Sequence, residues 1–321
     1  MSKDSHGVTA VPPRLEDRRA ASSAAVEGIE NQAHWRRLLA KVRTTLEMIK
    51  FQHSVFALPF ALTGALLARH AWPAWRQLAW LVVAMVGARS AAMTFNRLAD
   101  LKFDTLNPRT KMRALPAGLV SPAFATGFTV ASCALLVWAA FELNPLAFKL
   151  SPLALALLLG YSYTKRFTWL SHLLLGICLG ASPVAAWIAI RGDLKTGVVV
   201  LGAAVTLWVA GFDIIYACQD VYFDRQHGLE SIPSRFGIGA ALHISVALHV
   251  IMLALLVVVA RIENLGWVAG LGLLTVSVLL AYEHTLIKPS DLSRINAAFF
   301  TVNGYVSLLF FGTWAADILI H

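Results

Sequence analysis

Nine long apolar segments recur along the 321-residue chain, and they leave few folds open to it. A hydrocarbon core about 30 Å thick requires roughly 20 apolar residues in each helix that crosses it. The segments cover residues 52–69, 77–100, 119–142, 146–163, 168–190, 196–219, 238–260, 264–284 and 295–317. The sequence therefore predicts an all-α integral membrane protein built as a transmembrane helix bundle.

The composition agrees with a lipid environment. Only 14% of the residues are charged and 58% are hydrophobic, whereas about a quarter of a soluble domain is charged. Ten Trp and 17 Phe are typical of a chain with aromatic anchors at the membrane interfaces. The three cysteines are far apart and form no CxxC pair, so they predict neither a disulfide framework nor a metal site.

The first fifty residues differ from the rest of the chain. Residues 1–33 mix Ala, Ser, Pro and charged residues without the apolar core of a signal peptide, which predicts a disordered segment. Residues 34–50 place apolar side chains at helical spacing with basic residues on the other faces. This pattern predicts an amphipathic helix, lying on an anionic membrane surface or docked on the rim of the bundle. The transmembrane domain then takes residues 51–321.

Lys and Arg are distributed unevenly between the connections. With a cytoplasmic N-terminus, the inside connections carry eleven of them, the outside ones six, and the N-terminal segment nine more. The positive-inside rule then predicts the N-terminus in the cytoplasm and the C-terminus on the opposite side. The net charge of +9 is an orientation signal on this reading and does not indicate nucleic-acid binding. The remaining basic residue, Arg89, falls within a span, where a charge is costly and marks a functional residue.

Two acidic runs end the second and the sixth apolar segments. They read NRLADLKFD at 96–104 and FDIIYACQDVYFD at 212–224. Residues three, four and seven apart share a helical face, so continuous helices would carry two polar stripes on the predicted cytoplasmic side. The stripes consist of Arg89, Asn96, Asp100 and Asp104, and of Asp213, Asp220 and Asp224.

Carboxylates spaced four residues apart repel one another unless cations neutralise them. Several of them converging from two helices offer the oxygen ligands that Mg²⁺ prefers and shares with phosphates. The scarcity of charge elsewhere favours this interpretation over solvated helix ends with scattered acids. The sequence thus predicts a Mg²⁺ site.

Basic residues follow each acidic run. They are Arg109, Lys111 and Arg113, then Lys165 and Arg166, and finally Arg225 and Arg235. Each alone is explained by membrane orientation. Together with the carboxylates they fit a diphosphate clamp, in which the metal bridges carboxylate to phosphate and Lys or Arg binds the remaining oxygens.

These motifs resemble those of a known family. NRLADLKFD with DVYFD is similar to the NDxxDxxxD and DxxxD pair of the UbiA-type intramembrane prenyltransferase superfamily. YACQDVYFDRQHGLESIPSRFG looks like the second signature of its 4-hydroxybenzoate polyprenyltransferase-like branch. The resemblance covers about residues 45–317 and implies a nine-helix bundle around a central cavity that opens to the cytoplasmic side. It also implies Mg²⁺-dependent transfer of a polyprenyl chain from its diphosphate to an aromatic acid, in the inner membrane, for respiratory quinone biosynthesis.

The same resemblance implies roles for individual residues. Mg²⁺ and diphosphate would be held by Asn96, Asp100, Asp104, Asp220 and Asp224, of which Asp100 and Asp220 are central to catalysis. Phosphate oxygens would be bound by Lys111, Arg113 and Lys165. Asp213 would lie below the metals, near the acceptor, where it accepts or relays a proton.

The chain departs from the family pattern at Arg97, where Asp is usual. Arg97 is expected to pair with a carboxylate, bind phosphate or meet the carboxylate of the acceptor. Arg89, Lys50 or His53 is also expected to anchor that carboxylate electrostatically, although His53 also fits a packed interfacial histidine. Tyr161 and Tyr163 belong either to the interfacial aromatic belt or to the phosphate end of the cavity.

Several alternatives stay open. The first span lacks the Arg-x-x-x-Pro-x-Gly start of 4-hydroxybenzoate enzymes, and NPRT with GFDIIYACQD also resembles the group that prenylates a dihydroxynaphthoate in the alternative menaquinone pathway. An ion-coupled transporter would also use intramembrane Asp and Arg, but near the midplane. A membrane phosphotransferase would carry a DG-x-x-AR run, which the chain lacks. No protein partner is indicated.

Overall fold

The computed structural model describes residue 44 and residues 56–320, and this part of the chain contains helices and no β-strand. Eight of its helices are long and apolar enough to cross a membrane. Their ends lie within a few residues of the predicted spans. The spans are α3 Trp75–Ala99, α5 Pro122–Leu143, α6 Pro145–Gly160 with the 3₁₀ turn η2 Tyr161–Arg166, α7 Ser171–Arg191, α8 Thr196–Ala217, α11 Ile238–Ile262, α12 Trp267–Leu286, and the π-helix η4 Ala297–Val302 with α13 Asn303–Ile320.

The first predicted span is represented by α2 Leu58–Leu67. Its earlier residues fall outside the described part of the chain, as do the segments 1–33 and 34–50 with Lys50, and also His53. The prediction of an all-helical membrane protein is confirmed.

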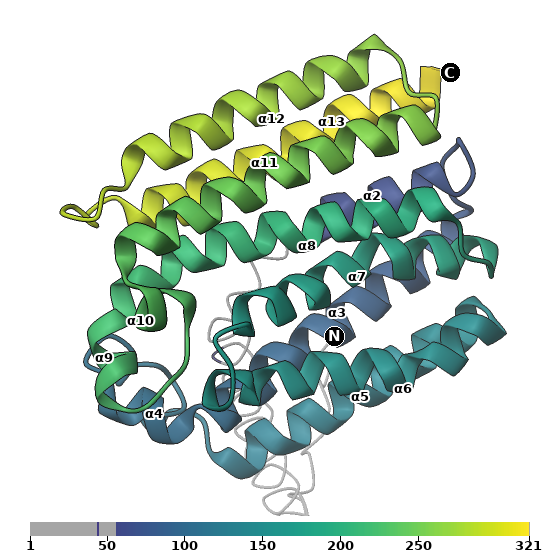
Figure 1. Ribbon diagram of the computed structural model, residues 1–321. Coiled ribbons are helices and arrows are strands. Elements are labelled where there is room, and N and C mark those ends of the chain that lie inside the picture. Colours follow the sequence, from purple (N-terminus) through teal and green to yellow (C-terminus); the bar gives the residue numbers. More distant parts are fainter. Residues whose placement is uncertain (1–43, 45–55, 321) are drawn as a thin grey trace, which may run out of the picture.

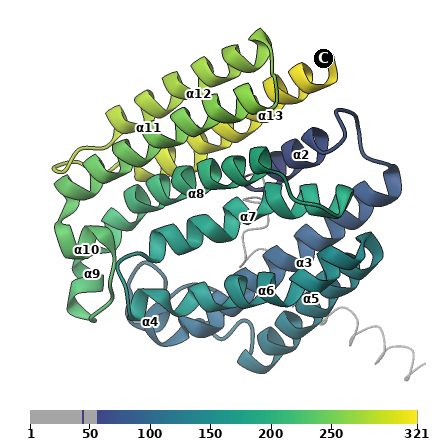
Figure 2. The same ribbon diagram turned by 45° about the vertical axis from the view of Figure 1, so that its right-hand side comes forward.

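The short helices gather at one end of the bundle. Figure 1 shows α4 Leu101–Leu106, α9 Val221–Gln226 and α10 Ile232–Phe236 at the left end, and Figure 2 shows the same arrangement from another side. The C-terminus lies at the opposite end (Figure 1). Both acidic runs therefore lie at the same end of the molecule.

Each acidic run breaks its helix, so the prediction of continuous helical stripes is wrong in detail. Asp100 separates α3 from α4 with φ −90° and ψ 2°. The 3₁₀ turn η3 Cys218–Asp220 separates α8 from α9, and Asp220 has φ −102° and ψ 2°. These φ and ψ values lie in the bridge region, where many active-site residues are found. Asp104, Asp220 and Asp224 consequently lie on the short elements α4, η3 and α9, whereas Asp213 stays within the span α8.

Aromatic rings form the centre of the core. The Phe60 ring on α2 lies 4.9 Å from Trp208 on α8 and 4.8 Å from Phe310 on α13, measured between centroids. All three residues are fully buried. Short α2 is thus fixed between two full-length spans.

Small residues allow α7 and α8 to approach closely. A Cβ atom on Gly180 would overlap the backbone carbonyl of Gly202 on the facing helix, and one on Gly176 would overlap the carbonyl of Thr206. Helices in lipid gain their association from such close backbone packing. Because α8 carries the second acidic run, this contact fixes the position of that run.

Substitution of Gly180 by Ala is expected to lower the free energy of unfolding by about 1–3 kcal/mol, because backbone atoms must move apart. Thermal unfolding of the purified protein in detergent measures the effect. Gly270→Ala is the matched control, since a Cβ there meets open space. Equal melting temperatures for the two variants would contradict the role of this contact.

Candidate active site

A cavity of about 270 Å³ lies among α3, α4, η2, α7, α8, α9 and η4. Its wall is divided in chemistry. Most of the charged and amide side chains come from the ends of the helices and the loops beside them, namely Asn96, Arg97, Asp100, Asp104, Asn107, Arg109, Arg113, Lys165, Arg166, Asp213, Asp220 and Asp224, whereas Arg89 lies farther inside α3. Apolar side chains, several of them from farther inside the spans, are Phe56, Met93, Leu175, Leu179, Val209, Phe212, Phe299 and Phe300. The cavity therefore joins a charged mouth to an apolar interior.

Asp104 is held by two arginines. Nη1 of Arg113 donates to both of its carboxylate oxygens, at 2.8 and 2.9 Å. Nη1 of Arg97 lies 3.7 Å from Oδ2 of the same carboxylate. Asp104 is 7% exposed, and a carboxylate buried to that degree requires such partners. The departure from the family motif at position 97 thus supplies a cation beside an acid of that motif.

Asp220 forms a bidentate ion pair with the guanidinium of Arg109. Nη2 donates to Oδ2 at 2.6 Å and Nε donates to Oδ1 at 3.0 Å, while the Asn107 amide donates to Oδ1 at 3.3 Å. Burial by itself would lower the pKa of Arg109, but its hydrogen bonds with Asp220 raise that pKa overall. A two-bond arginine–carboxylate pair of this kind also fixes orientation.

Asp100 and Asp224 have weaker partners. Asp100 accepts a hydrogen bond from the Asn96 amide at 3.2 Å, and Asp224 accepts one from the Ser231 hydroxyl at 3.1 Å. Neither forms an ion pair within 4.0 Å with any described residue. Burial raises the pKa of the Asp100 carboxyl above its ordinary value, and the charge of Lys165 offsets only part of that effect.

Lys165 is the cation that the acids share. Its ammonium group interacts electrostatically with Asp224, Asp100, Asp213 and Asp220. Asp220 is also paired with Arg109, whereas Asp100, Asp213 and Asp224 form no ion pair with Lys or Arg within 4.0 Å among the described residues. Carboxylate oxygens without a cation in direct contact fit a hard divalent cation such as Mg²⁺.

Asp213 is oriented by His172, a residue that the sequence analysis did not single out. Nδ1 of His172 lies 2.7 Å from Oδ2 of Asp213, and Nε2 accepts the backbone N–H of Ile232 at 3.3 Å. Because Nε2 is an acceptor, the ring proton is on Nδ1, which donates to the carboxylate. His172 is completely buried. It therefore fixes the direction of the Asp213 carboxylate at the cavity wall.

The basic residues near the cavity fall into two groups. Arg89, Arg97, Arg113 and Lys165, which the sequence analysis assigned to substrate binding, line it, and so do Arg109 and Arg166. Lys111 is exposed and is absent from the wall, as are Arg225 and Arg235. Among the paired tyrosines, Tyr161 lines the cavity, whereas Tyr163 is exposed and packs against Arg166. Nε of Arg97 is buried and has no hydrogen-bond partner among the residues described, which leaves a donor for a ligand.

Comparison with known proteins identifies the family. The model of the UbiA prenyltransferase family matches residues 57–309. The chain belongs to this family. A 4-hydroxybenzoate octaprenyltransferase from Enterobacter sp. (strain 638) is 34% identical over 223 residues, which is 70% of this chain and 76% of the relative. The predictions of the family and of a prenyltransferase enzyme are confirmed, and the transporter alternative is removed.

Solved structures share the fold. A UbiA homologue from Aeropyrum pernix K1 has a TM-score of 0.76 and 37% identity, over 84% of this chain and 98% of the homologue. A homologue from Archaeoglobus fulgidus, bound to DMAPP and Mg²⁺, has a TM-score of 0.67 and 18% identity, over 86% of this chain and 99% of that chain. The second likeness is evidence for the fold alone.

Asp100 and Asp220 differ in their cationic partners, so replacing each by Asn tests how much those partners stabilise the fold. Because the folded-state pKa of Asp100 is raised, its ionised form at neutral pH disfavours folding, and this cost disappears as the pH falls below that pKa. Asp100→Asn is thus expected to keep or raise the melting temperature at pH 7 without divalent cations. Asp220→Asn removes the charge that is paired with Arg109 and is expected to lower the free energy of unfolding by about 1–3 kcal/mol.

Thermal unfolding of both variants, with a chelator present, makes the comparison. The two substitutions are identical in chemistry and both remove an acid from the same cavity, so each controls for the other. A similar fall in melting temperature for both would contradict the assignment of Arg109 to Asp220 and of Asp100 to an uncompensated position.

Proposed function

We propose that this protein transfers a polyprenyl chain from its diphosphate to an aromatic carboxylic acid, 4-hydroxybenzoate or a close analogue, in respiratory quinone biosynthesis. The observation that carries the proposal is the division of one cavity into a charged mouth and an apolar interior. A polyprenyl diphosphate has the same division. Further support comes from family membership and from the activity named for the Enterobacter relative.

The charged mouth holds the diphosphate in this proposal. Asn96, Asp100, Asp104, Asp220 and Asp224 would supply the oxygen ligands for Mg²⁺. A Mg²⁺ ion held there would supply positive charge beside the leaving diphosphate. The Archaeoglobus homologue, which shares the fold, is bound to Mg²⁺ together with DMAPP. Asp100 and Asp224, which lack arginine partners among the described side chains, are the first ligands available.

The cations of the mouth bind the remaining phosphate oxygens. Lys165 and Arg97 face the cavity, and Arg113 can share its guanidinium between Asp104 and the ligand. Lys111, exposed beside the mouth, is proposed to meet the outer phosphate. These groups stabilise the diphosphate more strongly as its charge increases in the transition state, and that difference accelerates the reaction.

The apolar interior holds the prenyl chain and excludes water. The Phe299 ring lies 5.2 Å from Phe212 and 4.2 Å from Tyr216, measured between centroids. Breaking the allylic C–O bond leaves a carbocation that water would destroy. An aromatic wall shields that cation, and the electron-rich ring faces attract it.

The acceptor ring lies between the two parts of the cavity. Its carbon ortho to the hydroxyl forms the new C–C bond, and the proton displaced from that carbon passes to a base. Asp213 is that base in our proposal, and the Nδ1–H of His172 keeps its carboxylate in place. Arg89, on the cavity wall within α3, pairs with the carboxylate of the acceptor. The cavity mouth faces the cytoplasm and the C-terminus the opposite side, in agreement with the distribution of Lys and Arg.

One assay tests the function. Membranes containing the protein are given a labelled polyprenyl diphosphate with either 4-hydroxybenzoate or dihydroxy-6-naphthoate, and lipid-soluble product is measured. Product with 4-hydroxybenzoate is expected with Mg²⁺, is abolished by excess EDTA, and returns when Mg²⁺ is restored. Product with the naphthoate alone would assign the enzyme to the alternative menaquinone pathway. Turnover that persists in excess EDTA would contradict the metal assignment.

A second prediction concerns Arg89. Arg89→Leu is expected to raise the KM for the aromatic acid about tenfold or more, because a charged hydrogen bond contributes about 1.5–3 kcal/mol. The KM for the prenyl diphosphate is expected to stay within about twofold. Arg261→Leu is the control, since Arg261 is exposed in the last turn of α11. An unchanged KM for the acid would exclude Arg89 from the acceptor site.

A further inference from the structure

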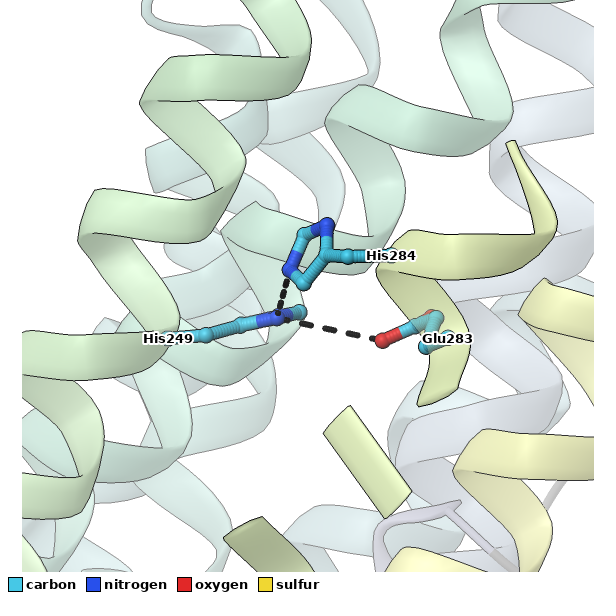
Figure 3. A group of neighbouring side chains, drawn as sticks. All are labelled: His249, Glu283 and His284. Atoms are coloured by element: carbon cyan, nitrogen blue, oxygen red, sulfur yellow. Dashed lines mark hydrogen bonds and ion pairs between the residues drawn. The ribbon is translucent and has the colours of Figure 1, made fainter. Parts of the chain in front are cut away.

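A second cluster of ligand side chains lies outside the cavity. His249 on α11 faces Glu283 and His284 on α12 (Figure 3), and one ligand atom from each lies within 4.8 Å of the others. Nδ1 of His249 is 2.9 Å from Nε2 of His284 and 3.8 Å from Oε2 of Glu283. None of the three lines the cavity described above.

The tautomer of His249 follows from its other neighbour. Its Nε2 lies 3.2 Å from the backbone carbonyl of Trp208. A carbonyl can only accept, so Nε2 carries the proton and Nδ1 presents its lone pair to Glu283 and His284. Histidines that bind metals almost always donate their second ring N–H to such a carbonyl or carboxylate. His249 therefore has the protonation and direction of a metal ligand.

One carboxylate oxygen of Glu283 accepts a hydrogen bond, and the other has no hydrogen-bond donor among the described residues. Oε1 accepts from Nδ2 of Asn303 at 2.6 Å, and Oδ1 of Asn303 accepts from the indole N–H of Trp208 at 2.8 Å. Oε2 receives no hydrogen bond from the residues the structure describes, although Glu283 is completely buried. A buried carboxylate oxygen left in this way is costly unless it has a further partner.

The backbone leaves room for this arrangement. A Cβ on Gly211 of α8 would overlap the His249 ring at Nε2, so glycine at that position permits the ring to reach the Trp208 carbonyl. His284 is half-exposed near the end of α12, which provides a path for an ion to enter. Two imidazoles and one carboxylate are a ligand set that Zn²⁺ uses in sites with an open fourth position.

The distances are compatible with one bound ion. Ligands at about 2.0–2.1 Å in tetrahedral geometry lie about 3.3 Å apart. The two observed separations from Nδ1, 2.9 and 3.8 Å, lie on either side of that value. An ion would take the place of the proton that His249 and His284 share, and Oε2 of Glu283 would move toward the two imidazole nitrogens. Rotation of the half-exposed His284 ring supplies the movement needed.

We propose that His249, Glu283 and His284 form a second metal site, which binds a divalent transition-metal ion of the Zn²⁺ class and ties α11 to α12. The nitrogen-rich ligand set distinguishes it from the oxygen-rich mouth of the cavity, because imidazole suits Zn²⁺ and Co²⁺ whereas carboxylates suit Mg²⁺. The bound ion would also fix Asn303, the residue that follows the cavity-lining π-helix η4.

Co²⁺ is the probe, because its visible absorption reports nitrogen ligation. The full-length protein in lipid nanodiscs is stripped with EDTA, supplied with excess Mg²⁺ to fill the cavity mouth, and titrated with Co²⁺. One equivalent is expected to bind with a visible band. Glu283→Gln and His284→Asn are each expected to weaken binding about tenfold or more. His243 is an exposed histidine on α11, the helix that carries His249. His243→Asn is therefore expected to leave the Co²⁺ affinity unchanged.

The wild-type titration decides the question even if a variant folds poorly. Absence of saturable Co²⁺ binding in the presence of Mg²⁺ would overturn the proposal and leave a hydrogen-bonded polar cluster. Equal affinity in wild type, Glu283→Gln and His284→Asn would overturn it as well, because the ion would then be bound elsewhere. The proposal does not depend on prenyl transfer, so these outcomes are independent of the activity assay.

Discussion

The compensation of negative charge at the end of a membrane bundle is the constraint on which the rest of this structure depends. Five aspartates line one cavity, and three of them are at least nine-tenths buried. Carboxylates removed from water to this extent require cations or hydrogen-bond donors. The loop after α4 brings Arg109 and Arg113 to the acids, and the 3₁₀ turn η2 brings Lys165 to the cavity.

The five aspartates are not equally compensated. Arg113 and Arg97 hold Asp104, and Arg109 holds Asp220, whereas Asp100 and Asp224 receive only neutral donors and share one lysine. Asp100 and Asp224, which have no cation in direct contact among the described residues, are the acids that our proposal assigns first to the divalent cation. Departures of this kind from full charge pairing are commonly retained at functional sites.

The helices supply the rigid frame for that site. Close backbone contact between α7 and α8 fixes the helix that carries Asp213, and the break at Ala217 turns Asp220 and Asp224 onto η3 and α9. The π-helix η4 brings Phe299 and Phe300 to the apolar wall, and single-turn π segments are frequent at functional sites. Packing and chemistry are therefore supplied by the same helices, since α8 carries both Gly202, which contacts α7, and Asp213, which lines the cavity.

By itself the sequence determined the helical membrane architecture, because hydropathy and helix length are local properties that lipid leaves little freedom to alter. Spacing within each acidic run likewise indicated which acids gather, and all of them line the cavity. The breaks at Asp100 and Asp220 escaped prediction because no Gly or Pro marks them. Only the tertiary structure decided which cation faces which acid. Arg109 and Asp220 are 111 residues apart, His172 and Asp213 are 41 apart, and His249 and His284 are 35 apart. Such pairs depend on how whole helices pack, and no local pattern in the chain records that packing.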